Sequence, residues 1–153
     1  HGHFDHIRGL KLLLKEYPSL NVYIHKDDKD SFSSPLLNAS NMDKQLFKID
    51  VDPILVNDGD IIKGLSEDIN VLHTPFHTLG CVCYYLCNSK LIFTGDTLFN
   101  MSIGRFDLPN SSFRLIKTSL AKLKGFDDEY IVYAGHGDDT NMGYEKRNNP
   151  YLR

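Results

Sequence analysis

The first six residues of the chain contain three histidines and one aspartate, at His1, His3, Asp5 and His6. His1 and His3 are two positions apart, so in an extended backbone their side chains leave on the same side. Asp5 and His6 are adjacent and lie where an apolar helical pattern begins. The segment therefore predicts two groups of metal ligands, which serve two neighbouring ions. The alternatives are a solvated polar loop or the remnant of a tag, although tags are unbroken runs of histidine.

The composition is that of one ordinary globular chain. Of 153 residues, 41% are hydrophobic and 24% are charged, which predicts a single domain over residues 1–153. The net charge of −3 and a pI of about 6.1 give no electrostatic reason to expect nucleic acid as a partner. No apolar run approaches the roughly 18 residues of a membrane span. Neither nucleic acid nor a membrane is therefore expected to bind.

The three cysteines, Cys81, Cys83 and Cys87, crowd into one apolar stretch. Neighbouring cysteines on one strand seldom form a disulfide. We therefore expect them to be reduced core residues in a reducing compartment, most simply the cytoplasm. The chain starts without Met and opens directly on its densest motif, so we expect the natural N-terminus upstream. Organellar targeting stays open for the same reason.

Hydrophobic spacing predicts short elements in the first half of the chain. Apolar residues at helical intervals predict an amphipathic helix over residues 5–17, which ends before a proline. Residues 21–25 are expected to form a strand, and the polar residues 26–48 a short helical or irregular surface segment. Residues 53–56 and 61–62 flank a strong turn signal, and we expect them to form a hairpin.

In the second half, three apolar runs each end in a polar turn. The runs cover residues 69–73, 91–93 and 130–133, and the turns after them carry His77, Asp96 and His136. Loops at one edge of a sheet can converge on a single site, so we expect these three side chains to lie together. The other expected elements are a strand and two helices, over residues 81–86, 113–123 and 141–147.

The opening segment and these turns together supply ligands for two ions. One ion would take His1, His3 and His77, and the other would take Asp5, His6 and His136. The two carboxylate oxygens of Asp96 could bridge them, and each ion would keep an open position for water, which marks catalytic sites. Imidazole and carboxylate ligands suit zinc, iron or manganese. The expected ligands are His1, His3, Asp5, His6, His77, Asp96 and His136.

Four motifs carry a resemblance to a known family. They are HGHFDH at residues 1–6, TPFHT at 74–78, TGD at 94–96 and AGHG at 134–137. In this order they resemble the metallo-β-lactamase superfamily, and within it the short hydrolases similar to glyoxalase II (hydroxyacylglutathione hydrolase). The resemblance implies an α/β (α+β) fold, an αββα sandwich with metals at one edge. It also implies that strands of the first sheet precede residue 1. The chain would then be an N-terminally truncated, partial domain whose exposed sheet edge favours self-association.

The resemblance further implies two divalent ions, most simply zinc, with iron or manganese as alternatives. A metal-bridging hydroxide, oriented by Asp5, would cleave a thioester such as a hydroxyacylglutathione. A thioester suits this site because its thiolate leaves near neutral pH without a strong general acid. β-Lactam hydrolysis is not expected, because many zinc β-lactamases carry Cys roughly where Asp96 stands.

Two other functions stay open. One is a mononuclear iron oxygenase similar to persulfide dioxygenases, which would use only His1, His77 and Asp96. The other is an inactive, truncated relative that acts as a binding module.

Substrate recognition rests on fewer residues. Arg105 lies where glyoxalase II enzymes carry a basic residue that binds a glutathione carboxylate, and the alternative is an ion pair with Asp107. Asp138 stands where those enzymes carry Tyr, which weakens the expectation of glutathione. Phe76 stands where the family usually has Gly, so we expect it to shift the His77 loop or to narrow the pocket mouth.

Two further histidines have structural interpretations. His73 precedes the TPFHT motif and is expected to brace that loop through a hydrogen bond. His25 ends a predicted strand and is expected to be a surface or structural residue.

Overall fold

The computed structural model describes residues 1–44, 46–63 and 66–153. Gln45, which belongs to the segment predicted to be irregular, lies outside these ranges, as do Gly64 and Leu65. The elements in chain order are α1 (Phe4–Ile7), α2 (Leu10–Glu16), β1 (Tyr23–His25), η1 (Lys26–Phe32), β2 (Ile54–Val56), β3 (Ile61–Ile62), β4 (Ile69–His73), β5 (Val82–Leu86), β6 (Leu91–Gly95), η2 (Phe113–Leu115), α3 (Ile116–Lys124), β7 (Ile131–Ala134), β8 (Thr140–Asn141) and α4 (Met142–Asn148).

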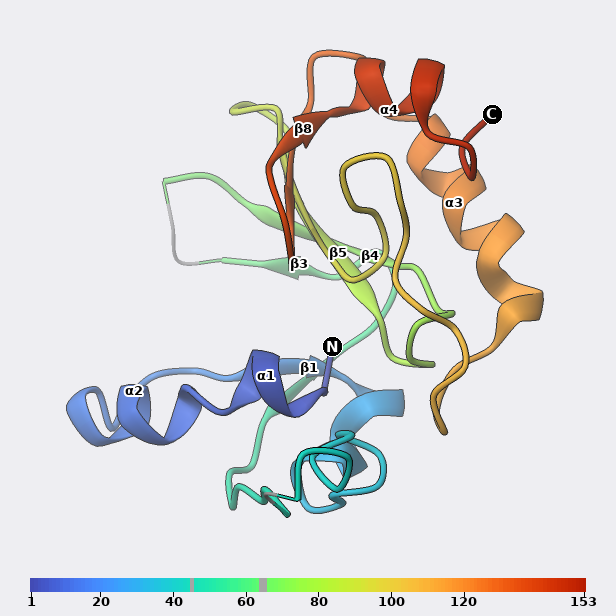
Figure 1. Cartoon of the computed structure of the whole chain (residues 1–153). Helices are drawn as coiled ribbons and strands as arrows, with labels where there is room; N and C mark the ends of the chain where they lie inside the picture. Colours follow the sequence, from blue (N-terminus) through green and yellow to red (C-terminus); the bar gives the residue numbers. More distant parts are fainter. Residues whose placement is uncertain (45, 64–65) are drawn as a thin grey trace.

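The strands form two sheets of unequal size. β1 and β2 pair in parallel, and the other strands form a six-stranded sheet in the order β3-β4-β5-β6-β7-β8. Its pairs are antiparallel except for β6 and β7, which the α3 connection makes parallel. In Figure 1 the α1, α2 and β1 elements lie below the larger sheet, α3 and α4 lie on its other side, and the N-terminus lies at the junction of the two parts.

Three hydrophobic clusters lie between four layers of helices and sheets. Ile7 of α1 and Ile24 of β1 belong to a cluster between the N-terminal helices and the small sheet. Val56 of β2 packs with Val71 and Val82, so the opposite face of the small sheet lies against β4 and β5. The largest cluster lies between the six-stranded sheet and α3 and α4. The layer order is therefore helix, sheet, sheet, helix, which confirms the expected αββα sandwich.

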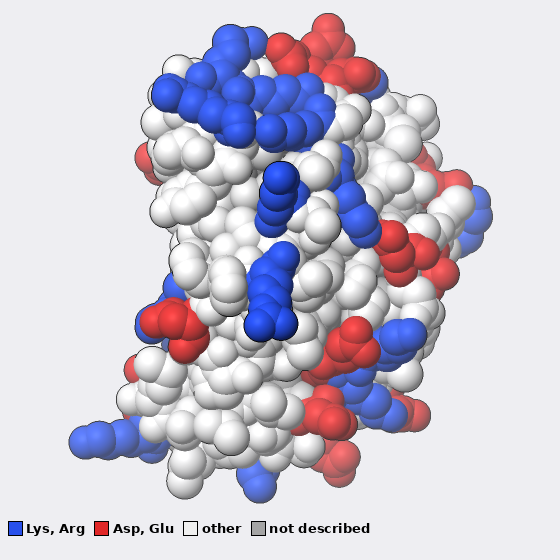
Figure 2. Space-filling view, turned by 90° about the vertical axis from the view of Figure 1, so that its right-hand side faces the viewer, with Lys and Arg blue, Asp and Glu red and all other residues white. Residues whose placement is uncertain are grey.

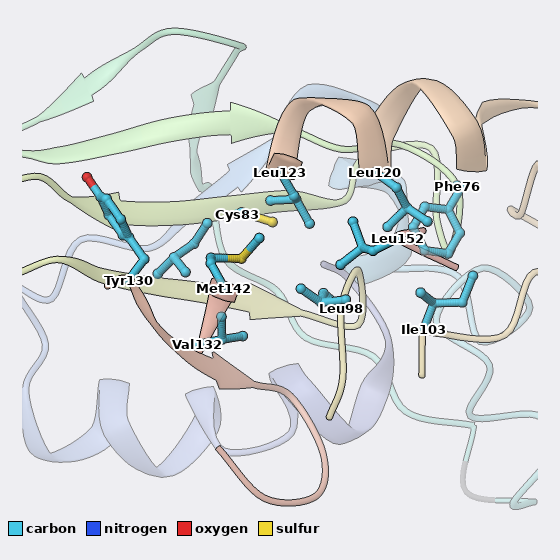
Figure 3. Packing of buried hydrophobic residues seen from close by; sticks show 11 residues of the cluster. Phe76, Cys83, Leu98, Ile103, Leu120, Leu123, Tyr130, Val132, Met142 and Leu152 are labelled. Atoms are coloured by element: carbon cyan, nitrogen blue, oxygen red, sulfur yellow. The ribbon is translucent and has the colours of Figure 1, made fainter. Parts of the chain in front are cut away.

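The largest cluster contains Phe76, which is fully buried. Figure 3 shows its ring next to Leu120 of α3, within the packed interior. Phe76 does not line the cavity beside the predicted ligands. The predicted narrowing of the pocket mouth is therefore wrong, because the side chain packs into the core instead.

The predicted hairpin of residues 53–56 and 61–62 is also wrong. β2 pairs with β1 in the small sheet, whereas β3 pairs with β4 in the large one. The turn between them forms, but the chain crosses there from one sheet to the other. The Asp58 carboxylate holds this turn against the large sheet, because it accepts hydrogen bonds from the backbone N–H of His73 and from the Lys122 ammonium.

The helix predicted over residues 5–17 is divided into α1 and α2. Gly9 lies at the break, in agreement with the low helix propensity of glycine. Only Ile7 of the predicted apolar face is buried, and the side chains of Leu13 and Tyr17 are largely exposed.

The three cysteines, Cys81, Cys83 and Cys87, are free. Cys81 and Cys83 are buried, whereas Cys87 is exposed, so the assignment of Cys87 to the core is wrong.

Basic side chains gather on one part of the surface. Figure 2 shows Lys and Arg concentrated at the upper end of the molecule, where α4 lies in Figure 1. Several basic residues of α3 and α4 are ion-paired: Lys122 with Asp58 at 2.9 Å, and both Lys146 and Arg147 with Asp128 at 3.0 Å. These pairs reduce the local positive potential, and the absence of nucleic-acid binding stays a prediction. Within the described ranges, no helix has the length and apolar character needed to cross a membrane.

Candidate metal centre

Three imidazoles meet at the junction of the two sheets, and we call them the histidine cluster: His1, His3 and His77. Their ring centroids lie 4.6–4.7 Å apart with nearly perpendicular planes. His3 Nδ1 is 3.0 Å from His1 Nε2 and 2.9 Å from His77 Nε2. A tetrahedral zinc ion holds its nitrogen ligands about 3.4 Å from one another. The two nitrogen separations at His3 are a few tenths of an ångström shorter than this, so only a small outward movement of the rings would let them share an ion.

A second group, the carboxylate cluster, consists of Asp5, His6 and His136. His136 Nε2 lies 3.1 Å from Asp5 Oδ2 and 3.3 Å from His6 Nε2. The side chains of Asp5 and His136 are 37% and 54% exposed, whereas that of His77 is 3% exposed. The carboxylate cluster is therefore the solvent-facing half of the centre.

Asp96 lies between the two clusters. Its Oδ2 is 3.3 Å from His77 Nε2 and its Oδ1 is 3.2 Å from His6 Nε2. Gly135 permits this position, because a Cβ there would lie 2.3 Å from Asp96 Oδ1. All seven predicted ligand residues thus lie within one centre. They fall into the two expected groups, and the groups adjoin, because the His1 ring also lies 4.1 Å from that of His6 and His1, His6 and Asp96 form a further close combination.

Hydrogen bonding orients His77 toward the other ligands. Its Nδ1–H donates to the carbonyl oxygen of Arg105 at 2.6 Å. Since a carbonyl only accepts, the proton belongs on Nδ1 and the lone pair on Nε2. The lone pair then points toward His3 and Asp96, which is the form a metal ion binds.

The pKa shifts of these side chains also favour the protonation states that bind metal ions. Burial, reinforced by the nearby His77, lowers the pKa of His3 to about 4, and burial likewise lowers the pKa of His77. Burial alone would raise the pKa of Asp96, but the imidazoles around it outweigh that effect and hold it below its ordinary value. Neutral imidazoles beside an ionised carboxylate are the states that coordinate metals.

The donor set passes a further test. Asp96 Oδ1 is buried and accepts no well-aligned hydrogen bond among the described residues, although His6 Nε2 lies 3.2 Å away, and His1 Nδ1 likewise has no partner there. An unsatisfied buried polar atom costs about 1–3 kcal/mol. A divalent cation would satisfy the carboxylate oxygen, so the residues present fit a metal ion.

A cavity of about 560 Å³ opens beside the centre. Its wall is partly apolar and includes Phe4 and Phe99, and two arginines also line it, Arg8 and Arg105. Arg105 pairs with Asp107 through two hydrogen bonds of 2.7 and 2.9 Å, so its guanidinium is engaged. Arg8 has no carboxylate within 4 Å in the described part of the chain.

A third group, His25, Asp27 and His73, lies apart from this centre. The rings of His25 and His73 stack 3.9 Å apart with planes only 13° from parallel. Ring lone pairs lie in the ring planes, so those of stacked rings run side by side and do not converge on an ion. His25 is buried and therefore structural, and His73 Nε2–H donates to the Leu79 carbonyl at 2.8 Å, which confirms the predicted brace.

Two residues near the centre were not predicted. Asp28 is buried beside the loops of the histidine cluster, although it lies in the segment expected to be a polar surface. Nothing in the sequence distinguishes it from the exposed Asp27 and Asp30, since its burial depends on contacts with distant loops. Arg8 could have been considered from its place two positions after His6.

The family model described as "Metallo-beta-lactamase superfamily" matches residues 1–136. Among curated proteins, the chain is 35% identical to hydroxyacylglutathione hydrolase GloC of Haemophilus influenzae, over 99% of this chain and 73% of that protein.

Two solved structures are also similar. One is titled BLEG-1 B3 metallo-beta-lactamase, with a TM-score of 0.91 and 32% identity. The other is TTHA1623 in a di-iron-bound form, with a TM-score of 0.87 and 33% identity. Each similarity covers 99% of this chain and 74% of the other.

Proposed function

The chain belongs to the metallo-β-lactamase superfamily, and we propose that it is a binuclear metallohydrolase that cleaves a thioester. The relative named as a hydroxyacylglutathione hydrolase supports this substrate class. We propose all seven residues of the centre as ligands, with zinc as the first choice of metal. The di-iron-bound neighbour supports iron as the alternative.

The position of Asp96 carries the proposal. One carboxylate lies within 3.3 Å of His77 in the histidine cluster and within 3.2 Å of His6 in the carboxylate cluster. A bridging ligand needs this placement between two groups. Divalent ions held there would lower the pKa of a water molecule toward about 7 and polarise a carbonyl oxygen.

Residues of the chain can also orient the attacking water molecule and accommodate the acyl chain. Asp5 lies at the solvent-facing side, with Oδ2 3.1 Å from His136 Nε2, so it can accept a hydrogen bond from the attacking water and orient it. The leaving thiol has a pKa near 8.5 and departs as the thiolate with little help from an acid. The apolar wall of the cavity is suited to the rest of the acyl chain.

The cavity also suggests which residue binds an anionic substrate. The resemblance to glyoxalase II favours Arg105, but Asp107 already neutralises its guanidinium. Arg8 lines the same cavity and has no acidic partner within 4 Å in the described ranges. We therefore assign the carboxylate-binding role to Arg8 in preference to Arg105.

Metal content and turnover test the proposal together. Purified protein should contain close to two metal ions per chain by elemental analysis and should hydrolyse S-lactoylglutathione or a simpler thioester. Asp96→Asn keeps the shape of the side chain but removes its charge, and should lower turnover by about 100-fold or more. The matched control is Asp127→Asn, because Asp127 is exposed, pairs with Lys90 at 2.6 Å and is not among the residues of the centre. Unchanged turnover of the Asp96 variant would remove the bridging role.

β-Lactam hydrolysis is a second candidate, favoured by the neighbour titled a B3 metallo-beta-lactamase. A chromogenic cephalosporin assayed beside the thioester distinguishes the two. Turnover of the cephalosporin alone would replace the thioester assignment.

The remaining alternatives give different results in the same measurements. A single iron per chain, with oxygen uptake on glutathione persulfide, would indicate the mononuclear oxygenase. Two bound ions without turnover of either substrate would indicate a binding module.

A further inference from the structure

Asp28 is a buried carboxylate that belongs to neither cluster of the metal centre. It lies in η1 directly after β1, and it is only 1% exposed, whereas Asp27 and Asp30 of the same helix are exposed. A buried carboxylate is costly unless several hydrogen bonds satisfy it. Its partners therefore indicate what it does.

Four donors surround the Asp28 carboxylate. Oδ2 accepts hydrogen bonds from the backbone N–H of Gly2 at 2.9 Å and from the Thr78 hydroxyl at 2.7 Å. Oδ1 accepts from the backbone N–H of Gly80 at 2.9 Å and from the Asn110 side-chain amide at 3.2 Å. Each oxygen thus has two donors, which come from three segments far apart in the chain.

These donors flank all three members of the histidine cluster. Gly2 stands between His1 and His3, and Thr78 directly follows His77. The carboxylate therefore fixes the backbone of the opening segment against the backbone of the His77 loop. The carboxylate cluster depends less on Asp28, since His136 follows β7 and His6 lies on α1, although the backbone N–H of His6 donates a hydrogen bond to the His3 carbonyl at 3.1 Å.

The fit around Asp28 is close. A Cβ at Gly80 would lie 2.5 Å from the Asp28 carboxyl carbon, so the loop can approach only because residue 80 is glycine. The site also requires an acceptor at both oxygens. The amide of an asparagine would turn an N–H₂ group toward two donors and leave them unsatisfied.

We propose that Asp28 is a positioning residue that sets the metal affinity of the histidine cluster, with little effect on the carboxylate cluster. It acts through the relative placement of His1, His3 and His77, because its own two oxygens are engaged by the four donors. The proposal rests on the two-metal centre of the proposed function. The new element is that the affinities for the two ions depend on different parts of the chain.

Metal titration of the full chain tests this asymmetry. Cobalt(II) is added to metal-free protein, and the two binding constants are obtained by competition with a chelator. In Asp28→Asn, one constant should weaken by about 10–100-fold, the range for residues that support metal ligands, and the other should change less than about threefold. Asp30→Asn, an exposed aspartate of the same helix, should leave both constants unchanged. Equal weakening of both constants, or of neither, would overturn the proposal.

Two further measurements keep the test decisive. If Asp28→Asn does not fold, Thr78→Ala removes only one of the four hydrogen bonds and should weaken the same constant to a smaller degree. NMR of the histidine rings in the metal-free protein shows which cluster is affected. The signals of His1, His3 and His77 should shift in the variant, and the His136 signal should not. A native chain that binds fewer than two ions would count against the proposed function, whereas an unmoved histidine cluster would count against Asp28.

Discussion

Arg8 and Arg105 differ in their neighbours, although both line the cavity beside the metal centre. Asp107 neutralises Arg105, and Arg8 has no such partner in the described part of the chain. A hydrogen bond to a charged group contributes about 1.5–3 kcal/mol, or about 10- to 100-fold in binding. The free guanidinium should therefore discriminate between charged and neutral substrates.

Arg8→Gln tests this role with two matched thioesters, S-acetyl-3-mercaptopropionate and its uncharged amide. The variant should lose about 10-fold or more in kcat/KM for the carboxylate and almost nothing for the amide. Lys15→Gln is the control, because Lys15 is an exposed cation of α2 that does not line the cavity. Equal losses for both thioesters would show that Arg8 does not bind the carboxylate.

His25 makes stability depend on pH at a place away from the metal centre. Burial, reinforced by the stacked His73, lowers the pKa of His25 below 6.5. The unfolded chain then takes up the proton more readily than the folded one, so stability is full above pH 6.5 and falls as the pH drops below it. A single group contributes a slope of at most about 1.4 kcal/mol per pH unit.

Urea unfolding of metal-free protein between pH 5 and 7.5 measures this effect. The free energy of unfolding should fall more steeply with decreasing pH in the native chain than in His25→Asn. The other histidines are present in both proteins, so their contributions cancel in the difference. Parallel curves would mean that His25 titrates normally.

At the scale of elements, Phe76 ties the His77 loop to α3. Its ring is fully buried beside Leu120, and removal of a buried phenylalanine side chain costs about 3–5 kcal/mol. Phe76→Ala should therefore lower the free energy of unfolding by that amount in chemical denaturation. Phe113→Ala should change it by less than about 0.5 kcal/mol, because Phe113 is 65% exposed. Similar losses in the two variants would contradict the packing role.

The elements that hold the ligands were predictable from local pattern. His77, Asp96 and His136 each follow an apolar run, and those runs are β4, β6 and β7 of one sheet. The alternation of strands and turns alone predicts that these turns share one edge of the sheet. How close the turns come to one another is decided by strand order and register.

The features that depend on distant contacts were not predictable in this way. The turn before β3 looks like a hairpin turn, and only pairing partners elsewhere decide that it connects two sheets. Asp28 resembles any solvated aspartate until Gly2, Thr78 and Gly80 surround it. Helical periodicity likewise marked Leu13 and Tyr17 as inward-facing, although both side chains are exposed in the folded chain.

At the scale of the whole molecule, the two sheets do not match in width. The small sheet packs on β4 and β5 through Val56, Val71 and Val82. The same face of the large sheet continues over β6 and β7, where Phe93 pairs in register with both Tyr84 and Tyr133. An apolar face thus extends beyond the layer that covers it.

Phe93, Ile131 and Tyr133 form this uncovered face, and they are 43%, 40% and 40% exposed. The rings of Phe93 and Tyr133 stack 5.4 Å apart, which gives a flat apolar surface. Surfaces of this kind promote association, because burial of aromatic area is strongly favourable. We propose that the 153-residue chain self-associates through this face.

Sedimentation velocity over a range of protein concentrations tests the proposed association. The weight-average sedimentation coefficient should rise with concentration in the native chain. Phe93→Ser combined with Tyr133→Ser removes both rings and should weaken association by about 10-fold or more, since 1.4 kcal/mol corresponds to a tenfold change in the dissociation constant. Phe113→Ser removes an aromatic ring that is more exposed but lies outside this face, so it should associate like the native chain. A native chain that stays monomeric throughout would contradict self-association. A double variant that associates as before would show that the chain associates through another surface.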